Sequence, residues 1–285
     1  MVNIQLLKPQ VRNYLTLADS LITVRGKGKT ISKLSRAFVQ NINEFSLAGF
    51  FHSSTWDPDD VNNSLESWII QTIIQKINQY KTKEVVISFD DTIATKYKDS
   101  NFELCELVWD HVTHRYVKGV QLVTIRITLP DNISFTYTVK PYLSKNKVSQ
   151  LNKKYGADTY QFKTKNKIVQ DELENLFSSL PNEIKKYVCF DSWYSSKKTI
   201  NFCIDNDAVV ICKIKSNRIF KDKVIKEHFS LTDKWIKKQV HYCKSSRSFL
   251  TRQKIGKLKG IKKEKVKIIA SRYHKRAKRQ VFILC

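Results

Sequence analysis

Two carboxylates and a hydroxyl follow an apolar run in the first half of the sequence. Glu84–Thr92 reads Glu-Val-Val-Ile-Ser-Phe-Asp-Asp-Thr, and its first part, Glu84–Phe89, has the apolar, β-branched character of a buried central strand. We predict that this strand ends at Asp90 and Asp91. Adjacent ionised side chains are costly to bury, so they need a cation or a solvated cleft. Acid pairs also close ordinary strands as turn-formers, so this stretch alone leaves both interpretations open.

A second stretch repeats the pattern of an apolar strand that ends in an acid. Lys186–Tyr194 reads Lys-Tyr-Val-Cys-Phe-Asp-Ser-Trp-Tyr, with Asp191 directly after the apolar residues. Two buried strands that each deliver a carboxylate predict a metal site, and oxygen donors suit Mg²⁺ or Mn²⁺ better than zinc. His111 and His114 have HxxH spacing, but on a strand or turn they lack the helical geometry of a zinc site. We interpret the two histidines as residues with a structural role or as residues that lie close to a bound nucleic acid.

The elements before the first acid pair are predicted to be helical. Apolar residues recur at helical spacing over Ile31–Phe45, and a second amphipathic helix is predicted over Ser64–Tyr80. A turn-rich connection around Trp56 separates the two, and we interpret its indole as a core residue. The basic Arg25–Lys29 segment is predicted to be an exposed loop, which either touches phosphates or is simply solvated.

From residue 84 onward the pattern predicts strands interrupted by helices. An antiparallel set followed by β-helix-β units is typical of a mixed α/β sheet. The predicted strands are Glu84–Phe89, Gly119–Leu129, Ile133–Val139, Tyr187–Phe190 and Ala208–Ile214. The predicted helices are Lys167–Ser179 and Ser195–Asn206.

The charge balance of the chain predicts a polyanionic partner. Fifty-one Lys and Arg residues stand against 26 acids, for a formal net charge of +25. A Lys- and Asn-rich composition shared across a proteome is the alternative explanation. We favour nucleic acid, because the charge is concentrated late in the chain. Thr251–Gln280 holds thirteen Lys or Arg residues and one acid, among short alternating segments that predict a phosphate-facing β region. The alternating segments extend over the region after Ser216, beyond this basic stretch, and are Trp235–Tyr242, Lys265–Ala270 and Val281–Leu284.

Cysteine usage and hydropathy predict where the protein works. The six cysteines show no CxxC pair, and Cys189, Cys203 and Cys212 have apolar neighbours, as expected of small buried residues in a reducing compartment. No signal peptide and no run long enough for a membrane span is visible. We therefore expect a soluble cytoplasmic, nucleoid-associated protein that does not interact with membranes.

An ordered set of motifs resembles the DDE transposases of bacterial insertion sequences, over nearly the whole chain. These motifs are Asp90-Asp91-Thr92, Asp110–Gly119 with the long strand after it, Asp191-Ser-Trp-Tyr194 with the next helix, and Lys213–Arg218. The resemblance implies an α/β fold with an RNase H-like mixed sheet and flanking helices. It also implies three regions. They are a helical N-terminal region (residues 1–80), part of the catalytic core (81–218) and a basic β-rich insertion region leading to the last core strand (219–285).

The same resemblance assigns roles to the acids. Asp91, the acid directly before Thr92, matches the first catalytic, metal-binding aspartate of the family, and Asp191 matches the second. Asp90 is the neighbour of Asp91, and Asp91 is preferred to it as the ligand. With Mg²⁺ or Mn²⁺ in a two-metal site, ions about 3.5–4 Å apart activate the attacking oxygen and stabilise the leaving one. The implied reaction is phosphodiester hydrolysis and strand transfer at the ends of an insertion element.

One acid of the family pattern has no counterpart in this chain. The family carries a third acid, a glutamate, in a Tyr-x-x-Arg-x-x-x-Glu pattern on a later helix. Tyr273 and Arg276 have the right spacing, but Gln280 then stands in place of the glutamate and leads into strand-like Val281–Leu284. We therefore expect a C-terminally truncated chain that lacks the catalytic helix, with an incomplete second metal site and little activity. The alternative is a non-catalytic DNA-binding protein that occupies element ends and inhibits an intact transposase.

The expected partner is double-stranded DNA, both as element ends and as target, with a homodimer or an intact transposase as a further partner. Trp193 and Tyr194 could stack on an unpaired base, although core packing is the stronger interpretation for Trp193. The residues predicted to contact DNA are Lys213, Lys215, Arg218, Lys262, Lys263 and Arg272.

Overall fold

The structure is a computed structural model of the chain. It describes residues 13, 17, 30–36, 43–53, 57–96, 102–130, 133–230, 232–242, 245–273 and 280–285. The predictions for Trp56 and Arg25–Lys29 lie outside these residues. The chain divides into two compact units, Met1–Gln71 and Thr72–Cys285. No helix in the described part is both long enough and apolar enough to cross a membrane.

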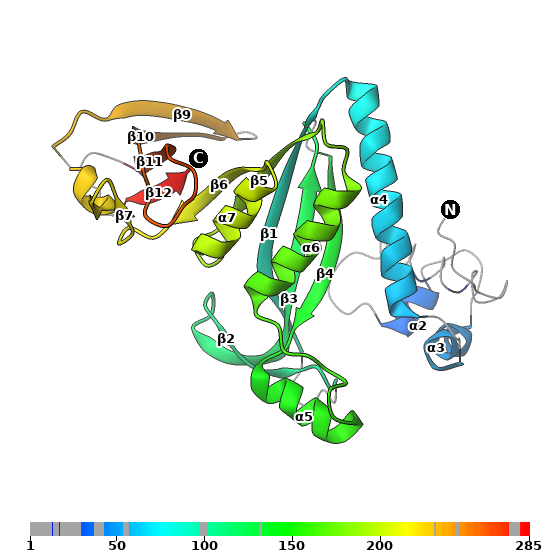
Figure 1. Cartoon of the computed structure of the whole chain (residues 1–285). Helices are drawn as coiled ribbons and strands as arrows, with labels where there is room; N and C mark the ends of the chain where they lie inside the picture. The colour runs from blue at the N-terminus through cyan, green and yellow to red at the C-terminus, as the bar shows by residue number, and fades with distance from the viewer. Residues whose placement is uncertain are drawn as a thin grey trace. The chain divides into compact units, whose positions relative to one another are not determined.

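Where the structure describes the first unit, it is helical, as predicted. It contains α2 (Ile31–Ser35), α3 (Glu44–Ser53) and the first part of α4 (Pro58–Tyr80), which continues into the second unit (Figure 1). Its core joins Leu34 of α2 to residues of α3 and to an earlier leucine, and it consists of Leu17, Leu34, Leu47 and Phe50. Phe45, predicted to lie on the apolar face of one helix, is 77% exposed. Two separate helices set this core, so helical spacing counted from Ile31 does not carry through to α3.

Helix α4 begins earlier than predicted, at Pro58 rather than Ser64. A proline fits the first helical position, because its fixed φ suits the helix and its missing N–H is not needed there. The backbone carbonyl of Asp57 accepts a hydrogen bond from the N–H of Val61, which starts the helical ladder. The predicted apolar face holds in part. Ile69, Ile73 and Ile77 are buried, whereas Leu65 and Trp68, predicted on the same face, are 40% and 46% exposed.

The second unit alternates strands with helices. Its strands are β1 (Glu84–Thr95), β2 (Glu106–Asp110), β3 (Arg115–Thr128), β4 (Ser134–Tyr142), β5 (Lys185–Phe190), β6 (Val209–Ile214), β7 (Ile219–Phe220), β8 (Lys223–Val224), β9 (Ile236–Tyr242), β10 (Ser245–Gly256), β11 (Val266–Arg272) and β12 (Val281–Leu284). Its other helices are α5 (Lys145–Tyr155), α6 (Lys165–Ser179), α7 (Lys197–Asp205) and the short 3-10 helix η1 (Ile225–His228).

Ten of the strands in the described residues form one mixed sheet. Its order is β2-β3-β1-β5-β6-β12-β11-β10-β9, with β4 also paired to β3. Strand β1 pairs antiparallel with β3 and parallel with β5, and β5 pairs parallel with β6. Four strands joined by antiparallel pairing, β1 to β4, are thus followed by β5 and β6, which run parallel to β1 and are reached by crossovers through α6 and α7. The predicted RNase H-like mixed α/β sheet is confirmed.

Strand β1 lies at the centre of this core and has two different faces. Val85, Ile87 and Phe89 are buried, whereas Val86 between them is 39% exposed. Helices α6 and α7 pack over the sheet, as Figure 1 shows, and α6 contributes the fully buried Leu173. The period of two expected for a half-covered strand therefore decides which of the two adjacent acids turns towards the helices.

The prediction that β1 stops at the acid pair is wrong. The strand continues to Thr95, because its pairing with β3 extends to the bridge between Thr95 and Gly119. Pairing with β5 ends earlier, at Ser88 and Cys189. Asp90 and Asp91 therefore lie within a strand, at the point where it loses its parallel neighbour. An apolar run marks how far a strand is buried, not how far it is hydrogen-bonded.

Two elements of the core were not predicted. The β2–β3 hairpin carries exposed apolar residues, including Leu107 at 74% exposure, so its pattern does not alternate between apolar and polar. Helix α5 buries only Val148 and Leu151, which leaves a weak helical pattern. Glu106 of β2 ties the two together, because its carboxylate accepts hydrogen bonds from the N–H and the hydroxyl of Ser144, the N-cap of α5.

The basic C-terminal region is β-rich, as predicted. Strand β12 pairs with both β6 and β11, and so joins this region to the central sheet. Buried side chains around β7, η1 and β11 form its interior, among them Phe220, Phe229 and Ile268. The predicted limits of the three regions, residues 1–80, 81–218 and 219–285, stay predictions.

Truncating Ile87 to alanine should destabilise the chain far more than truncating its neighbour Val86. Ile87 is fully buried, so Ile87→Ala should lower the free energy of unfolding by about 2–5 kcal/mol. Val86→Ala, the matched control on the exposed face, should cost at most about 1 kcal/mol. Urea denaturation followed by circular dichroism measures both. Equal losses would contradict the assignment of faces on β1.

Candidate active site

Asp91 is the centre of the polar cluster on the helix-covered face of β1. One carboxylate oxygen, Oδ2, accepts a hydrogen bond from Nζ of Lys165 at 2.6 Å. The other, Oδ1, accepts one from the hydroxyl of Tyr194 at 2.9 Å. The side chains of Asp91 and Lys165 are 21% and 26% exposed, so the ion pair is only partly solvated. A half-buried carboxylate is thus compensated on both oxygens, as physical chemistry requires.

Tyr194 is held rigidly where it meets Asp91. Its side chain is 2% exposed, and its ring packs edge-on against Phe89, which in turn stacks on Phe190 with centroids 4.8 Å apart. Burial, with the nearby charge of Asp91, raises the pKa of Tyr194. The hydroxyl therefore stays a proton donor to the carboxylate at neutral pH.

Asp191 lies at the end of β5, and the sheet register brings it level with Asp90. The last bridge between β1 and β5 joins Ser88 to Cys189, and two residues further on in each strand are these two acids. Burial raises the pKa of Asp90, and the charges of Asp191 and Asp91 raise it further, against a hydrogen bond from the N–H of Asp91. Asp191 itself accepts a hydrogen bond from the N–H of Trp193 at 2.8 Å. Three carboxylates thus share one region of negative potential.

The loop after β5 is fixed by contacts with two helices and a distant arginine. Thr199 in the first turn of α7 bonds to Asn166 and Gln170 of α6, which ties the two helix N-termini together. Arg218 donates a hydrogen bond from Nη1 to the carbonyl of Ser195 at 3.0 Å, and burial lowers the pKa of its guanidinium. Asp191 and Tyr194 therefore stand on a braced loop.

Two hollows meet at Asp91. The larger, of about 490 Å³, is lined by β1 residues, by the β2–β3 hairpin with Trp109 and His111, and by Trp193. The smaller, of about 330 Å³, extends towards Tyr142 and the start of α6. Trp193 is 72% exposed and lies beside His111, with ring centroids 6.4 Å apart, so it is not the core residue that the sequence favoured. His111 and His114 lie in the hairpin turn, not on a helix.

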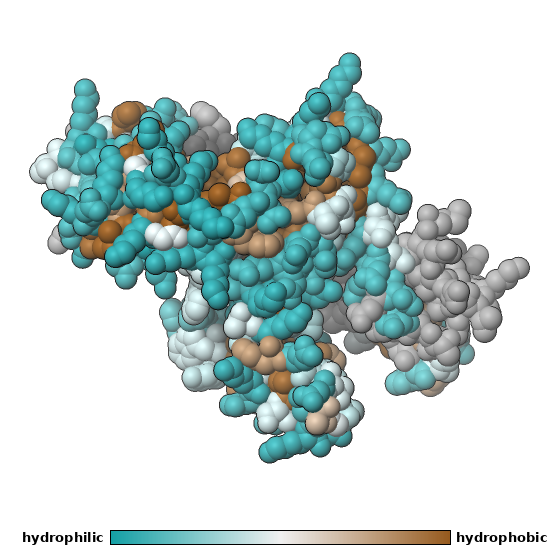
Figure 2. All heavy atoms as spheres, in the orientation of Figure 1, coloured by the Kyte–Doolittle hydropathy of each residue, from teal (hydrophilic) through white to brown (hydrophobic). Residues whose placement is uncertain are grey.

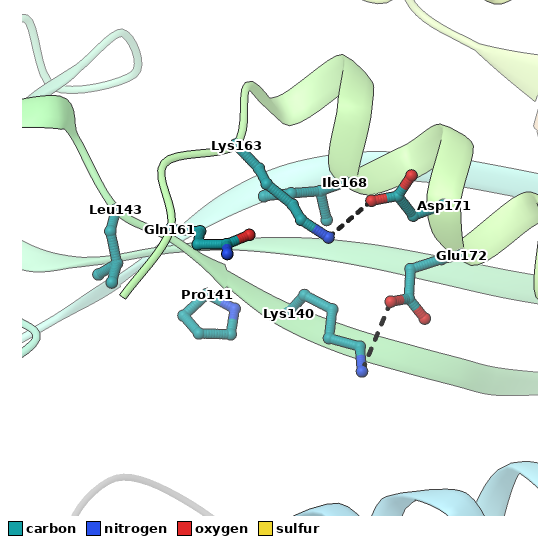
Figure 3. A pocket seen from close by; sticks show the side chains of 8 residues that line it. All are labelled: Lys140, Pro141, Leu143, Gln161, Lys163, Ile168, Asp171 and Glu172. Atoms are coloured by element: carbon teal, nitrogen blue, oxygen red, sulfur yellow. Dashed lines mark hydrogen bonds and ion pairs between the residues drawn. The ribbon is translucent and has the colours of Figure 1, made fainter. Parts of the chain in front are cut away.

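A third hollow, of about 270 Å³, lies beside α6, and none of Asp90, Asp91 and Asp191 lines it. Figure 3 shows two lysines pointing across it towards carboxylates of α6. Lys163 pairs with Asp171 at 2.8 Å, and Lys140 of β4 pairs with Glu172 at 3.5 Å. Although partial burial opposes it, hydrogen bonds from Lys163 and Lys167 lower the pKa of Asp171. These pairs attach α6 to β4 and to the loop before the helix.

The donor chemistry of the site fits a hard divalent cation. Asp90, Asp91 and Asp191 supply only carboxylate oxygens, which Mg²⁺ and Mn²⁺ prefer. Within the described residues, however, no three His, Cys, Asp or Glu side chains are grouped closely enough to hold a metal ion. Asp91 and Asp191 are the acids that the sequence predicts as ligands, and that assignment stays a prediction. The structure adds Asp90 as the acid level with Asp191.

The residues predicted to contact DNA fall into two groups. Lys213, Lys215 and Lys263 are exposed. The other three have contacts within the chain. Arg218 braces the loop after β5, Lys262 pairs with Asp205 of α7 at 2.5 Å, and Arg272 is 4% exposed with its guanidinium 4.2 Å from the centroid of Trp235. Burial leaves Arg272 little surface for a phosphate.

Sequence reasoning missed Lys165 and the hydroxyl contact of Tyr194. Lys165 follows the N-cap Thr164, whose side chain accepts the N–H of Lys167. Cations in the first turn of a helix oppose its dipole, and the first turn of α6 contains no acid. Helices α5 and α7 also begin with lysines and have no acid in the first turn, so this pattern by itself does not point to Asp91.

The strand order and the acids at its centre define an RNase H-like protein with a carboxylate site. A family described as "Archaeal putative transposase ISC1217" matches residues 56–241, and the chain belongs to this family of DDE transposases. The predicted class, a DDE transposase, is confirmed, while bacterial origin and truncation stay predictions. Members of the DDE class generally use divalent metal ions. No curated protein matches the chain.

Solved structures match the chain at a low level of sequence identity, and one of them is described here. It is the piggyBac transposase in a synaptic complex with hairpin DNA, 8% identical, with a TM-score of 0.48. The match covers 97% of this chain and 51% of that one, so the chain spans about half the length of the piggyBac protein.

Replacing Tyr194 by phenylalanine should measure the hydroxyl contact to Asp91. The variant keeps the ring packing on Phe89 but leaves Oδ1 without its donor. We expect the free energy of unfolding to fall by about 1–2 kcal/mol, because Asp91 is partly solvated and recovers some hydration. Tyr116→Phe, at a tyrosine that is 68% exposed, is the control and should change little. A null effect of Tyr194→Phe in urea denaturation would contradict the contact.

Proposed function

We propose that this chain acts in DNA transposition, by metal-dependent phosphodiester hydrolysis and strand transfer at the ends of an insertion element. One observation carries the proposal. Asp91 and Asp191 stand on neighbouring parallel strands at the centre of an RNase H-like sheet, in a chain that belongs to a DDE transposase family. The substrate is double-stranded DNA, as element end and as target, and the protein works in the cytoplasm.

Each part of the site has a role in this proposal. Asp91 and Asp191 hold Mg²⁺ or Mn²⁺, which supplies the charge that activates an attacking oxygen and stabilises a leaving one. Tyr194 fixes the orientation of the Asp91 carboxylate, and Arg218 braces the loop that carries Asp191. The two hollows beside Asp91 provide room for a DNA strand.

The number of acids limits the catalysis we expect. Among the described residues only Asp90 joins the two proposed ligands, and it neighbours one of them in the chain. We therefore propose weak second-metal binding and little cleavage, unless a third carboxylate comes from elsewhere, for example from a second copy or an intact transposase. The same observation favours a second candidate function, a non-catalytic DNA-binding protein that occupies element ends.

The electrostatic surface supports DNA binding under both functions. The chain carries a formal net charge of +25. Figure 2 shows mostly hydrophilic residues over the face displayed, with smaller apolar patches. Lys213 and Lys215 lie at the end of β6 beside β5, and both are exposed. Because phosphate contacts release counterions, this binding should be strongly salt-dependent.

Removing either proposed ligand should severely weaken metal binding, whereas removing the neighbouring acid should not. Asp91→Asn and Asp191→Asn should weaken Mn²⁺ binding by at least about 100-fold, and Asp90→Asn by at most about tenfold, as for an outer group. Isothermal titration calorimetry with Mn²⁺ measures all three. If Asp90→Asn had the largest effect, Asp90 and not Asp91 would be the ligand.

Nicking of supercoiled DNA separates the two candidate functions. Mn²⁺-dependent nicking that Asp91→Ala abolishes would show a working nuclease. We expect at most weak nicking by the chain alone. Salt-sensitive DNA binding without cleavage, together with inhibition of an intact transposase, would support the second function.

A double substitution of the lysines at the end of β6 should lower the salt dependence of DNA binding. Removing one lysine–phosphate interaction reduces the slope of log K against log salt by about 0.9, so Lys213→Ala with Lys215→Ala should reduce it by about 1.8. Lys153→Ala on α5, also an exposed lysine, is the control and should leave the slope unchanged. Fluorescence anisotropy with a labelled duplex at several salt concentrations gives the slopes. Equal slopes would place the phosphate contacts elsewhere.

A further inference from the structure

Nζ of Lys165 donates a hydrogen bond to Oδ2 of Asp91, the carboxylate oxygen that points towards the start of α6. The distance is 2.6 Å, and both side chains are largely shielded from solvent. The ring of Tyr142 lies 5.2 Å from the same Nζ, which gives the cation a second favourable contact. Lys165 is the first residue of α6, where the helix dipole disfavours a cation. The contacts with Asp91 and Tyr142 are what stabilise the charge in this position.

The two groups on Asp91 differ in their freedom to move. Tyr194 is buried and packed against Phe89, so its hydroxyl is fixed. Lys165 has a flexible four-carbon stem, and its side chain lines both hollows that meet at Asp91. A divalent cation and this ammonium group would compete for one carboxylate oxygen. Of the two partners of Asp91, Lys165 is the one that can leave.

We propose that Lys165 is a built-in counter-cation that competes with metal for Asp91 and moves onto a DNA phosphate when a strand enters the site. A phosphate in either hollow offers the ammonium group an alternative anion, and its departure frees Oδ2 of Asp91. DNA and metal then bind with positive coupling, each favouring the other. This inference rests on the proposed function, in which Asp91 holds the metal.

The test measures Mn²⁺ affinity with and without a short DNA duplex, from the loss of the electron paramagnetic resonance signal of free Mn²⁺. Lys165→Met keeps most of the stem and removes the charge. Without DNA, this variant should bind Mn²⁺ at least about fivefold more tightly than the unmodified chain. Adding DNA should tighten Mn²⁺ binding by a similar factor in the unmodified chain and have little effect in Lys165→Met.

Two further variants serve as controls. Lys163→Met removes the lysine two residues before Lys165, in the loop that precedes α6. Its partner is Asp171 and not Asp91, so this variant should leave Mn²⁺ affinity unchanged. Lys165→Arg retains the charge and should keep the affinity low. Thermal unfolding by circular dichroism checks each fold, and Lys165→Gln replaces the methionine variant if that one does not fold.

The outcomes separate this inference from the function on which it rests. Asp91-dependent Mn²⁺ binding that Lys165→Met and Lys165→Gln leave unchanged or weaken would overturn the counter-cation alone. Coupling to DNA that persists in these variants would do the same. Mn²⁺ binding that Asp91→Asn does not reduce would overturn the metal site and the counter-cation together.

Discussion

The parallel pairing of β1 with β5 is the contact on which the whole site depends. It places two chain segments about one hundred residues apart side by side, and its end determines where the acids lie. Beyond Ser88 and Cys189 the two strands separate, so backbone groups and side chains become accessible just where Asp90, Asp91 and Asp191 follow. Helices α6 and α7 start at this same edge, because each crossover brings the chain back over one face of the sheet. The site is a consequence of where the parallel pairing stops.

Three carboxylates in so small a region repel one another, and the surrounding structure is arranged to compensate. Asp91 accepts hydrogen bonds from the ammonium group of Lys165 and from the fixed hydroxyl of Tyr194. Asp191 accepts one from the backbone N–H of Trp193 in its own loop. The pKa of Asp90 is raised. Arg218 adds a brace to the loop that carries Asp191. These compensations differ in rigidity. The hydroxyl and the backbone group are fixed, whereas the lysine is flexible, so the site can exchange one internal cation without disturbing its framework.

Much of the core was predictable from local patterns. The alternation in β1, the apolar run of β5 and the helix over residues 167–179 each follow from burial on one or two faces, which a short window records. The misses have a common cause. Strand β2 carries exposed apolar side chains, α5 buries only two residues, and β1 continues past its buried part through its pairing with β3. Each element is stabilised by contacts that its own apolar pattern does not record: β2 by its hairpin pairing with β3, α5 by the contact of its N-cap with Glu106, and the end of β1 by its pairing with β3.

The sequence by itself predicted the fold class and the family, because apolar patterns and an ordered set of short motifs carry them. The metal-binding roles of Asp91 and Asp191 stay a prediction from the resemblance. Only the tertiary structure decided which groups the acids meet. Lys165 and Asp91 are 74 residues apart, and no local pattern links them. The choice of face also belongs to the tertiary structure. Because side chains alternate along a strand with a period of two, adjacent acids point to opposite faces of the sheet. Asp91 lies on the face that the helices cover, where Lys165 is its partner. Asp90 is level with Asp191.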